Sequence, residues 1–342
     1  MHGTAEYLQR ILRGEALPAA EAEALMTRIM AGEFTTAQIA ALAVALRAKG
    51  ETEEEITGFA RAMRAGAVHL PGAPDNVLDT CGTGGDGLAT FNVSTTAALI
   101  AAGAGACVAK HGNRAASSRA GSADVLEALG VQLDIPAAGA ARMLREVGIV
   151  FLFARAYHPA MRHAAAARAE LGIRTVFNLL GPLTNPAGAR RQLMGVFSGV
   201  STACVAGVLR ALGAEHAMVV RGDDGMDEIS LCAPTEVSEL RDGHIATHHV
   251  TPEQFGFVRC DHTELQGGDA QENAQLVRAV LDGVRGPYAD IAVFNAGAAL
   301  YVAGRARSWE EGIALARAAV MSGAARAALE RLIRASNEAH GG

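Results

Sequence analysis

The feature that most constrains the fold is an alternation, after residue 72, of short apolar segments with alanine-rich segments of helical pattern. The apolar segments span residues 76–81, 105–111, 148–153, 192–197, 216–222 and 290–296. Strands that alternate with helices are typical of a parallel sheet, because each parallel connection needs a crossover. More polar strands joined by turns are expected between residues 228 and 250. We therefore predict an α/β fold with a mainly parallel sheet wrapped by helices.

The first 72 residues lack this alternation and show only helical patterns. Thr35 and Gln38 have the spacing of a capping box, as have Thr52 and Glu55, and each pair precedes an apolar stripe of helical period. We expect a small all-helical domain over residues 1–72.

A second helical stretch interrupts the α/β pattern. Residues 158–186 are mostly helical in pattern and carry Gly-Pro and Asn-Pro pairs, which favour a hinge-like return of the chain. We predict that this insertion rejoins the small helical domain. The large α/β domain then comprises residues 73–157 and 187–342.

Composition narrows the class of function. The 342 residues carry a net charge of -6 and only 4% aromatic residues, which argues against nucleic-acid binding and favours small-molecule work. Charged residues make up 19% of the chain, below the roughly 25% typical of soluble proteins. Part of the surface is therefore expected to be buried in a homo-oligomer.

The cysteines and the apolar runs bear on location. The five cysteines are scattered and never have the CxxC spacing, so neither a disulfide framework nor a zinc site is predicted. The first ten residues lack a basic segment followed by an apolar one, and the apolar run of residues 95–109 is short for a membrane span. We expect a cytoplasmic protein without membrane contact.

A glycine-rich loop, residues 82–87, follows the first predicted strand and has the pattern G-x-G-x-x-G. A dinucleotide fold would begin its helix inside this motif, whereas here Ser94 or Thr95 is the better predicted helix start. The second strand leads into Lys110, His111 and Arg114 instead of the carboxylate that binds the ribose of NAD. An NADP site and a simple tight turn both remain open at this point.

Two loops have the chemistry of a phosphate site. Asn92, Ser94 and Thr95 would place polar side chains beside free N–H groups at a helix N-terminus. Residues 110–122 add cations and hydroxyls after the second strand. Because the carboxyl ends of parallel strands share one crevice, a ligand with phosphates at both ends would fit these loops.

Asp86 does not suit a plain phosphate loop, because a carboxylate repels phosphate unless it accepts hydroxyl protons or acts through a metal. A sugar hydroxyl or a nearby Mg²⁺ ion would explain it. Two downstream acidic pairs are candidates for the metal: Asp223 with Asp224, or Asp227 with Glu228.

Five motifs, in order, resemble the anthranilate phosphoribosyltransferase family over nearly the whole chain. They are GTGGD at 82–86, NVST at 92–95, KHGNRAASS at 110–118, GIRTVFNLLGPLTNP at 172–186 and DGMDE at 224–228. The resemblance implies transfer of phosphoribose from phosphoribosyl diphosphate to the amine of anthranilate, in tryptophan biosynthesis. It also implies a helical domain hinged to an α/β domain, and a homodimer paired through the helical domain.

The same resemblance assigns site residues by motif match. Those expected to hold phosphoribosyl diphosphate are Gly82, Gly85, Asp86, Thr90, Asn92, Val93, Ser94, Thr95, Lys110, His111, Gly112, Asn113, Arg114, Ala115, Ala116, Ser117, Ser118 and Ser122. Those expected to bind Mg²⁺ are Ser94, Asp227 and Glu228, which leaves Asp223 and Asp224 as a surface turn. Those expected to meet anthranilate are Gly82, Asn113 and Arg168. No side chain is expected to act as an obligatory general base.

The residues expected to bind anthranilate are assigned less firmly by the motifs than those expected to bind phosphoribosyl diphosphate. A guanidinium fork can bind the carboxylate of anthranilate, and Arg162 and Arg174 are rivals that only the motif match sets below Arg168. His111 and His158 are candidates to line the site, and a bonded structural histidine is the alternative for each. Arg155 stands where the family usually has proline, near the expected acceptor entrance.

Two other functions are compatible with the fold. A pyrimidine nucleoside phosphorylase would use inorganic phosphate without magnesium, and a non-catalytic relative would bind nucleic acid. The KHGNR loop and the Asp227–Glu228 pair argue against the first, and the negative net charge argues against the second.

Overall fold

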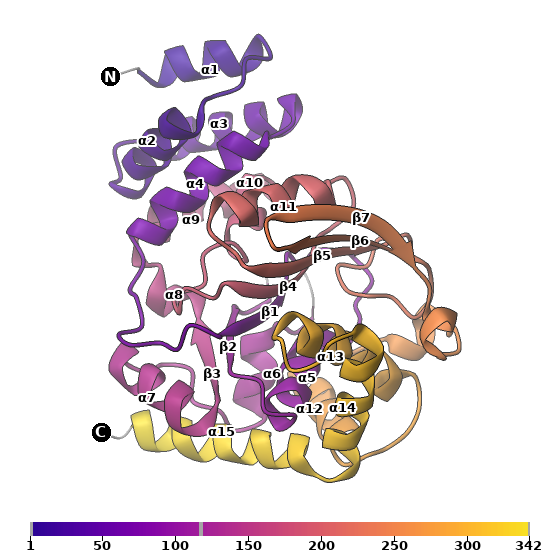
Figure 1. Ribbon diagram of the computed structural model, residues 1–342. Coiled ribbons are helices and arrows are strands. Elements are labelled where there is room, and N and C mark those ends of the chain that lie inside the picture. The colour runs from indigo at the N-terminus through magenta and orange to yellow at the C-terminus, as the bar shows by residue number, and fades with distance from the viewer. Residues whose placement is uncertain (1–2, 116–118, 341–342) are drawn as a thin grey trace.

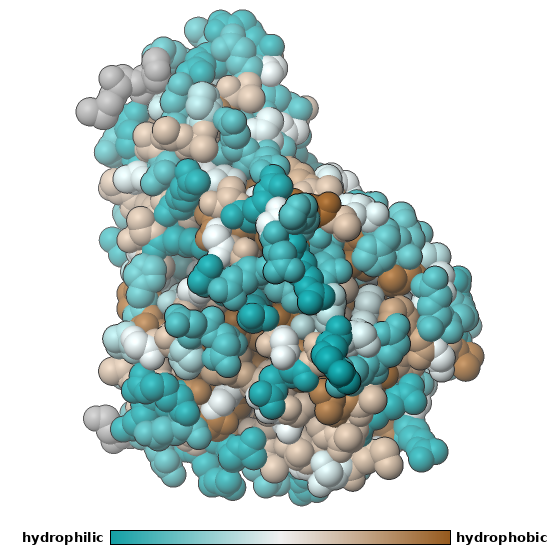
Figure 2. Space-filling model, in the orientation of Figure 1, coloured by the Kyte–Doolittle hydropathy of each residue, from teal (hydrophilic) through white to brown (hydrophobic). Residues whose placement is uncertain are grey.

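The computed structural model describes residues 3–115 and 119–340. Figure 1 shows a narrow helical part, which contains the N-terminal helices, above a broader part in which helices surround a sheet. In the same view the surface is mostly hydrophilic over both parts, with apolar residues in small scattered groups (Figure 2). The small helical part and the larger α/β part confirm the predicted fold class.

The sheet has seven strands within the described residues. They are β1 (Leu78–Gly82), β2 (Val108–Gly112), β3 (Ile149–Phe153), β4 (Arg191–Gly195), β5 (His216–Gly222), β6 (Thr235–Arg241) and β7 (His244–Val250). The order is β3-β2-β1-β4-β5-β6-β7, with parallel pairing from β3 to β5 and antiparallel pairing of β5, β6 and β7. The carboxyl ends of β1, β2 and β4 therefore lie together at the centre of one edge.

One predicted strand is wrong. Residues 290–296 lie inside helix α13 (Pro287–Val302), which packs against α5 and α14 and is buried on nearly every side. A helix that is apolar all round loses its helical period in the sequence, and a short stretch of it then reads like a buried strand. Pro287 at the start of α13 is a position that favours a helix.

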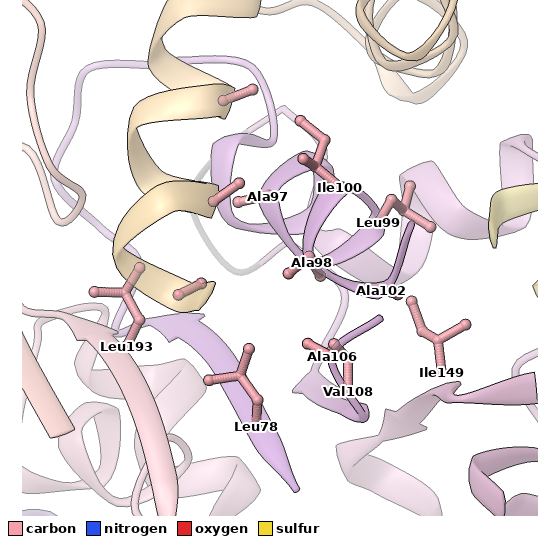
Figure 3. Packing of buried hydrophobic residues seen from close by; sticks show 14 of the residues in the cluster. Leu78, Ala97, Ala98, Leu99, Ile100, Ala102, Ala106, Val108, Ile149 and Leu193 are labelled. Carbon is pink, nitrogen blue, oxygen red and sulfur yellow. The ribbon is translucent and has the colours of Figure 1, made fainter. Parts of the chain in front are cut away.

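Helices cover both faces of the sheet (Figure 1). They are α5 (Val93–Gly103), α6 (Ser122–Ala128), α7 (Ala137–Val147), α11 (Thr202–Ala211), α12 (Ala270–Leu281), α13, α14 (Trp309–Met321) and α15 (Ala324–His340), with the short 3-10 helices η2 (Pro252–Phe255) and η3 (His262–Leu265). Figure 3 shows Leu78, Val108 and Leu193 on the strands and Ala98 and Leu99 on α5 in the main core. Close packing of alanines lets α5 approach the strands that lead to the glycine-rich loop.

The helical part begins with α1 (Thr4–Leu12), α2 (Ala19–Met30), α3 (Thr36–Lys49) and α4 (Glu53–Ala65). Both predicted capping boxes form, at Thr35 with Gln38 and at Thr52 with Glu55. Glu55 is fully buried, and it also accepts hydrogen bonds from the backbone N–H of Leu17 and from Lys49. This carboxylate therefore holds the α1–α2 connection against the start of α4.

The insertion after β3 contains α8 (Ala154–Tyr157), η1 (Pro159–Met161), α9 (Arg162–Leu171) and α10 (Val176–Leu180). Helix α9 packs against α2 and α3, and α10 packs against α3 and α4. The connecting segments run side by side, since the N–H of Val68 donates to the carbonyl of Tyr157 and that of Leu70 donates to the carbonyl of Pro186. The helical part is thus built from two separate stretches of the chain.

No single described helix is both long and apolar enough to cross a membrane. The pair α14 and α15 meets those criteria only jointly, by length and composition, and it is bent by 70°.

Candidate active site

The glycine-rich loop leaves the carboxyl end of β1 and leads to the N-terminus of α5. The N–H of Thr83 donates to the carbonyl of Gly195 at 3.0 Å, which holds the loop beside β4. Helix α5 starts at Val93 with Asn92 as N-cap, slightly earlier than the predicted start at Ser94 or Thr95. The Asn92 side chain does not cap the helix but bonds to neighbouring segments.

The acidic pair Asp227 and Glu228 is hydrogen-bonded to the glycine-rich loop and to the first turn of α5. Asp227 Oδ2 accepts from the N–H of Gly84 at 2.6 Å, and Glu228 Oε1 accepts from the N–H of Ser94 at 3.1 Å. The structure therefore brings together all three residues expected to bind magnesium. Burial and repulsion among neighbouring carboxylates raise the pKa of both acidic groups.

Two glycines make room for Asp227. A Cβ atom at Gly82 would overlap the Asp227 carboxylate, and one at Gly195 would overlap its carbonyl oxygen. These glycines end two adjacent strands, β1 and β4. The close approach of Asp227 therefore explains why residue 82 is a glycine, and no dinucleotide-binding motif is needed to explain it.

Asp224 differs from its predicted role as a surface turn. Its side chain is only 7% exposed, and it accepts hydrogen bonds from Ser230 Oγ at 2.6 Å and from the N–H of Met226 at 3.1 Å. Asp223 is exposed as expected, with 44% of its side chain accessible. A short carboxylate that bonds to its own turn is typical of a structural Asx turn.

Lys110 is buried and points at the start of α5. Its Nζ atom donates to the carbonyl of Thr80 at 2.5 Å and to Ser94 Oγ at 3.1 Å. Nearby Asp79 is also buried, and its Oδ1 accepts from the N–H of His111 at 3.1 Å. Burial raises the pKa of Asp79 to about 6, and Lys110 opposes that shift.

The loop after β2 lies against the N-terminus of α6. Ser122 Oγ donates to the carbonyl of Asn113, and the N–H of Ala115 donates to Asp124 at 2.9 Å. The guanidinium of Arg114 is bonded to Asp124 and Glu127, so in this structure it stabilises α6.

Gly112, at the end of β2, is also close to α6, because a Cβ atom at this position would overlap Ser122 Oγ. The predicted residues Ala116, Ser117 and Ser118 lie outside the described residues.

The remaining donor-site candidates lie along the loop before α5 and in the first turn of that helix. Thr90 pairs with Gln266 in an isolated β-bridge. The Asp86 carboxylate accepts from the N–H of Leu88 at 3.1 Å and lies close enough to Asp227 to raise the pKa of Asp227. Thr95 is buried, and its hydroxyl has no hydrogen-bond partner among the described residues.

Arg168 and Arg174 occupy different places in the insertion. Arg168, on α9, is exposed, and its guanidinium lies 5.9 Å from the ring centre of Phe177. Within the described residues it forms no hydrogen bond to Gly82 or Asn113. Arg174 instead lies against the glycine-rich loop, with its side chain in contact range of Gly85.

Arg174 also stacks on the large part. Its guanidinium lies 4.5 Å from the ring centre of Phe197, and one of its nitrogens, Nη1, is buried without a hydrogen-bond partner in the described chain. Arg47 donates to the carbonyl of Arg174, which ties it to α3. Arg174 is thus a cation at the junction of the helical part and the α/β part. The motif match did not indicate this position.

His111 and His158 face each other between the two parts, with ring centres 5.1 Å apart. The Nδ1 atom of His111 lies 3.1 Å from the carbonyl of Gly181, just after α10. Burial lowers the pKa of His111 to about 3 and that of His158 to about 4, so both rings are neutral at pH 7. The Nε2 atoms of both are buried without a partner in the described residues. Arg155 lies nearby in sequence, exposed on α8.

Sequence reasoning missed one residue that shapes the loop from far away. Asn273, on α12, is buried, and its Nδ2 donates to Asn92 Oδ1 at 2.9 Å across 181 residues of chain. The Asn92 Nδ2 in turn donates to the carbonyl of Ala120. A polar residue inside an amphipathic helix was the only available signal, and it did not indicate a partner.

The chain is similar to known proteins over nearly its whole length. Residues 5–67 match the glycosyl transferase family, helical bundle domain, and residues 74–326 match the glycosyl transferase family, a/b domain. The chain is 55% identical to the anthranilate phosphoribosyltransferase of Rubrobacter xylanophilus, with 98% of each chain covered.

Two solved structures are also similar. The crystal structure of anthranilate phosphoribosyltransferase from Thermus thermophilus is 48% identical, with a TM-score of 0.91, covering 97% of this chain and 99% of that one. The Saccharomyces cerevisiae anthranilate phosphoribosyltransferase, solved in complex with PRPP and Mg, is 26% identical, with a TM-score of 0.89 and 98% of each chain covered.

Proposed function

Because the chain belongs to the anthranilate phosphoribosyltransferase family, we propose that it transfers the phosphoribosyl group of 5-phospho-α-D-ribose 1-diphosphate to the amine of anthranilate. The products would be N-(5-phosphoribosyl)anthranilate and diphosphate. One observation carries the proposal: Asp227 and Glu228 are hydrogen-bonded to Gly84 and Ser94, so an acidic pair closes over a phosphate-type loop.

The chemistry of this donor set suits Mg²⁺. Two carboxylates and the hydroxyl of Ser94 are hard oxygen ligands, and buried carboxylates with raised pKa values are groups that a divalent cation would stabilise in the charged form. When bound, Mg²⁺ would supply Lewis-acid stabilisation of the departing diphosphate. Asp227, Glu228 and Ser94 are the residues we assign to hold it.

The protein contributes fixed positive charge and N–H groups to the donor. The N-terminus of α5 and the glycine-rich loop offer backbone N–H groups, and Lys110 adds an ammonium beside Ser94. These groups would hold the diphosphate while C1 of the ribose acquires oxocarbenium character. A preorganised donor of this kind contributes about 3 kcal/mol of transition-state stabilisation.

The acceptor would enter between the two parts. We assign the carboxylate of anthranilate to Arg168, and the neutral rings of His111 and His158 to the wall of the acceptor site. The attacking amine becomes an aryl ammonium, which is acidic enough to lose its proton to water, so no side chain is needed as an obligatory base. Approach of the helical part to the α/β part would align the amine with C1 and exclude water.

The activity can be tested by following the loss of anthranilate fluorescence in the presence of phosphoribosyl diphosphate and Mg²⁺. We expect turnover that disappears after chelation and returns with added Mg²⁺. Asp227→Asn should reduce kcat/KM by about 100-fold or more. The exposed Asp223→Asn is a matched control and should behave like the unmodified protein.

The same assay separates the alternative functions. Cleavage of a pyrimidine nucleoside by inorganic phosphate, with no metal-dependent loss of anthranilate, would favour a phosphorylase. Nucleic-acid binding without either reaction would favour a non-catalytic relative. The sequence and structure comparisons support the transferase.

We further propose a homodimer paired through the helical part. Leu12 on α1 and Val44 on α3 are exposed there, at 72% and 40%, and a surface hollow of about 420 Å³ lies between α1 and α2. Light scattering of Leu12→Arg would test this: we expect a shift from dimer to monomer. A cytoplasmic location is consistent with the free thiol state of all five cysteines.

A further inference from the structure

Two loops outside the donor site bring together metal-binding side chains. Asp224 and Cys232 lie on the connection between β5 and β6, and His262 begins η3. One ligand atom of each lies within 4.8 Å of the other two. A second thiol, Cys260, lies with its Sγ atom 3.8 Å from that of Cys232.

Two of the distances between these atoms match the edges of a tetrahedral site. Zinc binds thiolates at about 2.3 Å, which requires an edge of about 3.8 Å between two sulfurs, as found for Cys232 and Cys260. Zinc binds nitrogen and oxygen at about 2.0–2.2 Å, which requires an edge of about 3.4 Å. The Nε2 atom of His262 lies 3.5 Å from Asp224 Oδ2. The sulfurs are too far apart for a disulfide, whose S–S length is about 2.05 Å.

The surroundings of the cluster orient the ligands. Ser230 Oγ donates to Asp224 Oδ2 at 2.6 Å and accepts from the N–H of Cys232 at 2.8 Å, so one hydroxyl links two of the ligands. Outer hydrogen bonds of this kind are a regular feature of metal sites.

The cluster joins two walls of the donor site. Asp224 lies in the same turn as Asp227, one of the residues assigned to Mg²⁺. The segment after His262 bonds to the loop before α5, because the N–H of Phe91 donates to the carbonyl of Leu265 and the N–H of Gly267 donates to that of Ala89. An ion held here would therefore fix the acidic turn relative to the loop.

We propose that Asp224, Cys232 and His262 form a structural site for a thiophilic divalent ion of the zinc class, distinct from the magnesium site, and that the neighbouring thiol of Cys260, which lies outside the three-residue cluster, completes the site when the ion binds. Its ligands come from two loops, and its two cysteines are widely spaced in the sequence. Because the two cysteines are far apart in the sequence, a search for the CxxC pattern does not find this site. Binding of the ion can be measured without reference to the proposed transferase activity.

Co²⁺ is the probe for the first experiment, because tetrahedral Co²⁺–thiolate coordination gives strong visible and near-ultraviolet absorption. The full chain, dialysed against a chelator under reducing conditions, should bind one Co²⁺ with these bands. Zn²⁺ should displace the ion, and millimolar Mg²⁺ should not. Absence of thiolate bands, or bands removed by Mg²⁺, would overturn the proposal.

Substitutions then locate the ligands. Cys232→Ser, Cys260→Ser and His262→Gln should each weaken Co²⁺ binding by at least about tenfold, since even loss of an outer hydrogen bond costs 10–100-fold in affinity. Cys107→Ser is the matched control, because Cys107 is a free, partly buried thiol elsewhere in the large part. Unchanged affinity in the Cys232 variant would contradict the site.

A measurement on the unmodified chain covers the case in which these variants do not fold. Zn²⁺ should slow alkylation of Cys232 and Cys260 at least tenfold, as measured by peptide mass spectrometry. The rate at Cys204 should not change. Equal rates at Cys232 with and without Zn²⁺, or recovery only of a Cys232–Cys260 disulfide, would overturn the proposal.

Discussion

The Oδ2 atom of Asp227 accepts a hydrogen bond from the backbone N–H of Gly84 at 2.6 Å, and this bond joins segments 143 residues apart. The position of the acidic pair therefore depends on the backbone path of the glycine-rich loop. Changes in that loop should affect catalysis through the carboxylate as well as through contact with the donor.

Gly82→Ala is expected to displace the Asp227 carboxylate, because the new Cβ would overlap it. A shift of about 1 Å at a reacting group lowers rates by about 100-fold, so we expect that loss in kcat/KM together with a higher Mg²⁺ requirement. Steady-state kinetics over a range of Mg²⁺ concentrations measures both. Gly181→Ala is the control, since Gly181 has helical φ and open space around its Cβ position. Wild-type Mg²⁺ dependence in the Gly82 variant would contradict this account.

Arg168→Ala is expected to raise the KM for anthranilate by about 10–100-fold, since a charged hydrogen bond contributes about 1.5–3 kcal/mol. The KM for phosphoribosyl diphosphate should stay within about twofold. Arg162→Ala, on the same helix, is the matched control. If Arg174→Ala raised the anthranilate KM and Arg168→Ala did not, the acceptor assignment would have to move to the arginine beside Gly85.

The double variant His111→Ala, His158→Ala is expected to keep more than about 1% of wild-type kcat. A general base typically contributes 100- to 10,000-fold, and these rings are weak bases because burial lowers their pKa to about 3 and about 4. Saturating kinetics combined with calorimetric binding of both substrates would test this. Loss of turnover with intact binding would show that a side-chain base is required.

His158 should make the protein less stable in acid. Its pKa in the folded state, about 4, lies below the ordinary 6.5, so below pH 6.5 the unfolded chain takes up a proton that the folded chain does not. The free energy of unfolding should therefore fall between about pH 6.5 and pH 4, by about 2 kcal/mol at pH 5 from this group. Urea unfolding of wild type and His158→Gln at pH 7.5 and pH 5 should show a smaller fall in the variant. Equal falls would exclude His158 as the cause.

The sequence predicted most of the sheet because its strands alternate with helices and end at glycines or polar residues. The segments that became β1 to β5 were all anticipated. The segment 290–296 was not a strand, because the hydrophobic periodicity that separates helix from strand vanishes when a helix such as α13 is buried on every side.

The candidate site was predictable where its residues are close together in motifs, and less so where the fold joins distant segments. Asn273 reaches Asn92 across 181 residues, and no local pattern indicates such a bond. Arg174 was weighed only as a rival for the acceptor, yet it packs on Gly85 and Phe197. Asp224 looked like a surface turn because two adjacent aspartates usually face solvent, and only the fold shows that one of them points inward.

The two-stretch construction of the helical part has a consequence for synthesis. Helices α3 and α4 are packed by α9 and α10, which the ribosome makes only after β1, β2 and β3. At bacterial-type elongation rates of roughly 5–20 residues per second, the first four helices wait on the order of ten seconds for these partners. During that time apolar side chains on α3 and α4 face solvent. Nascent chains stalled before residue 180 should therefore be the species that needs a chaperone.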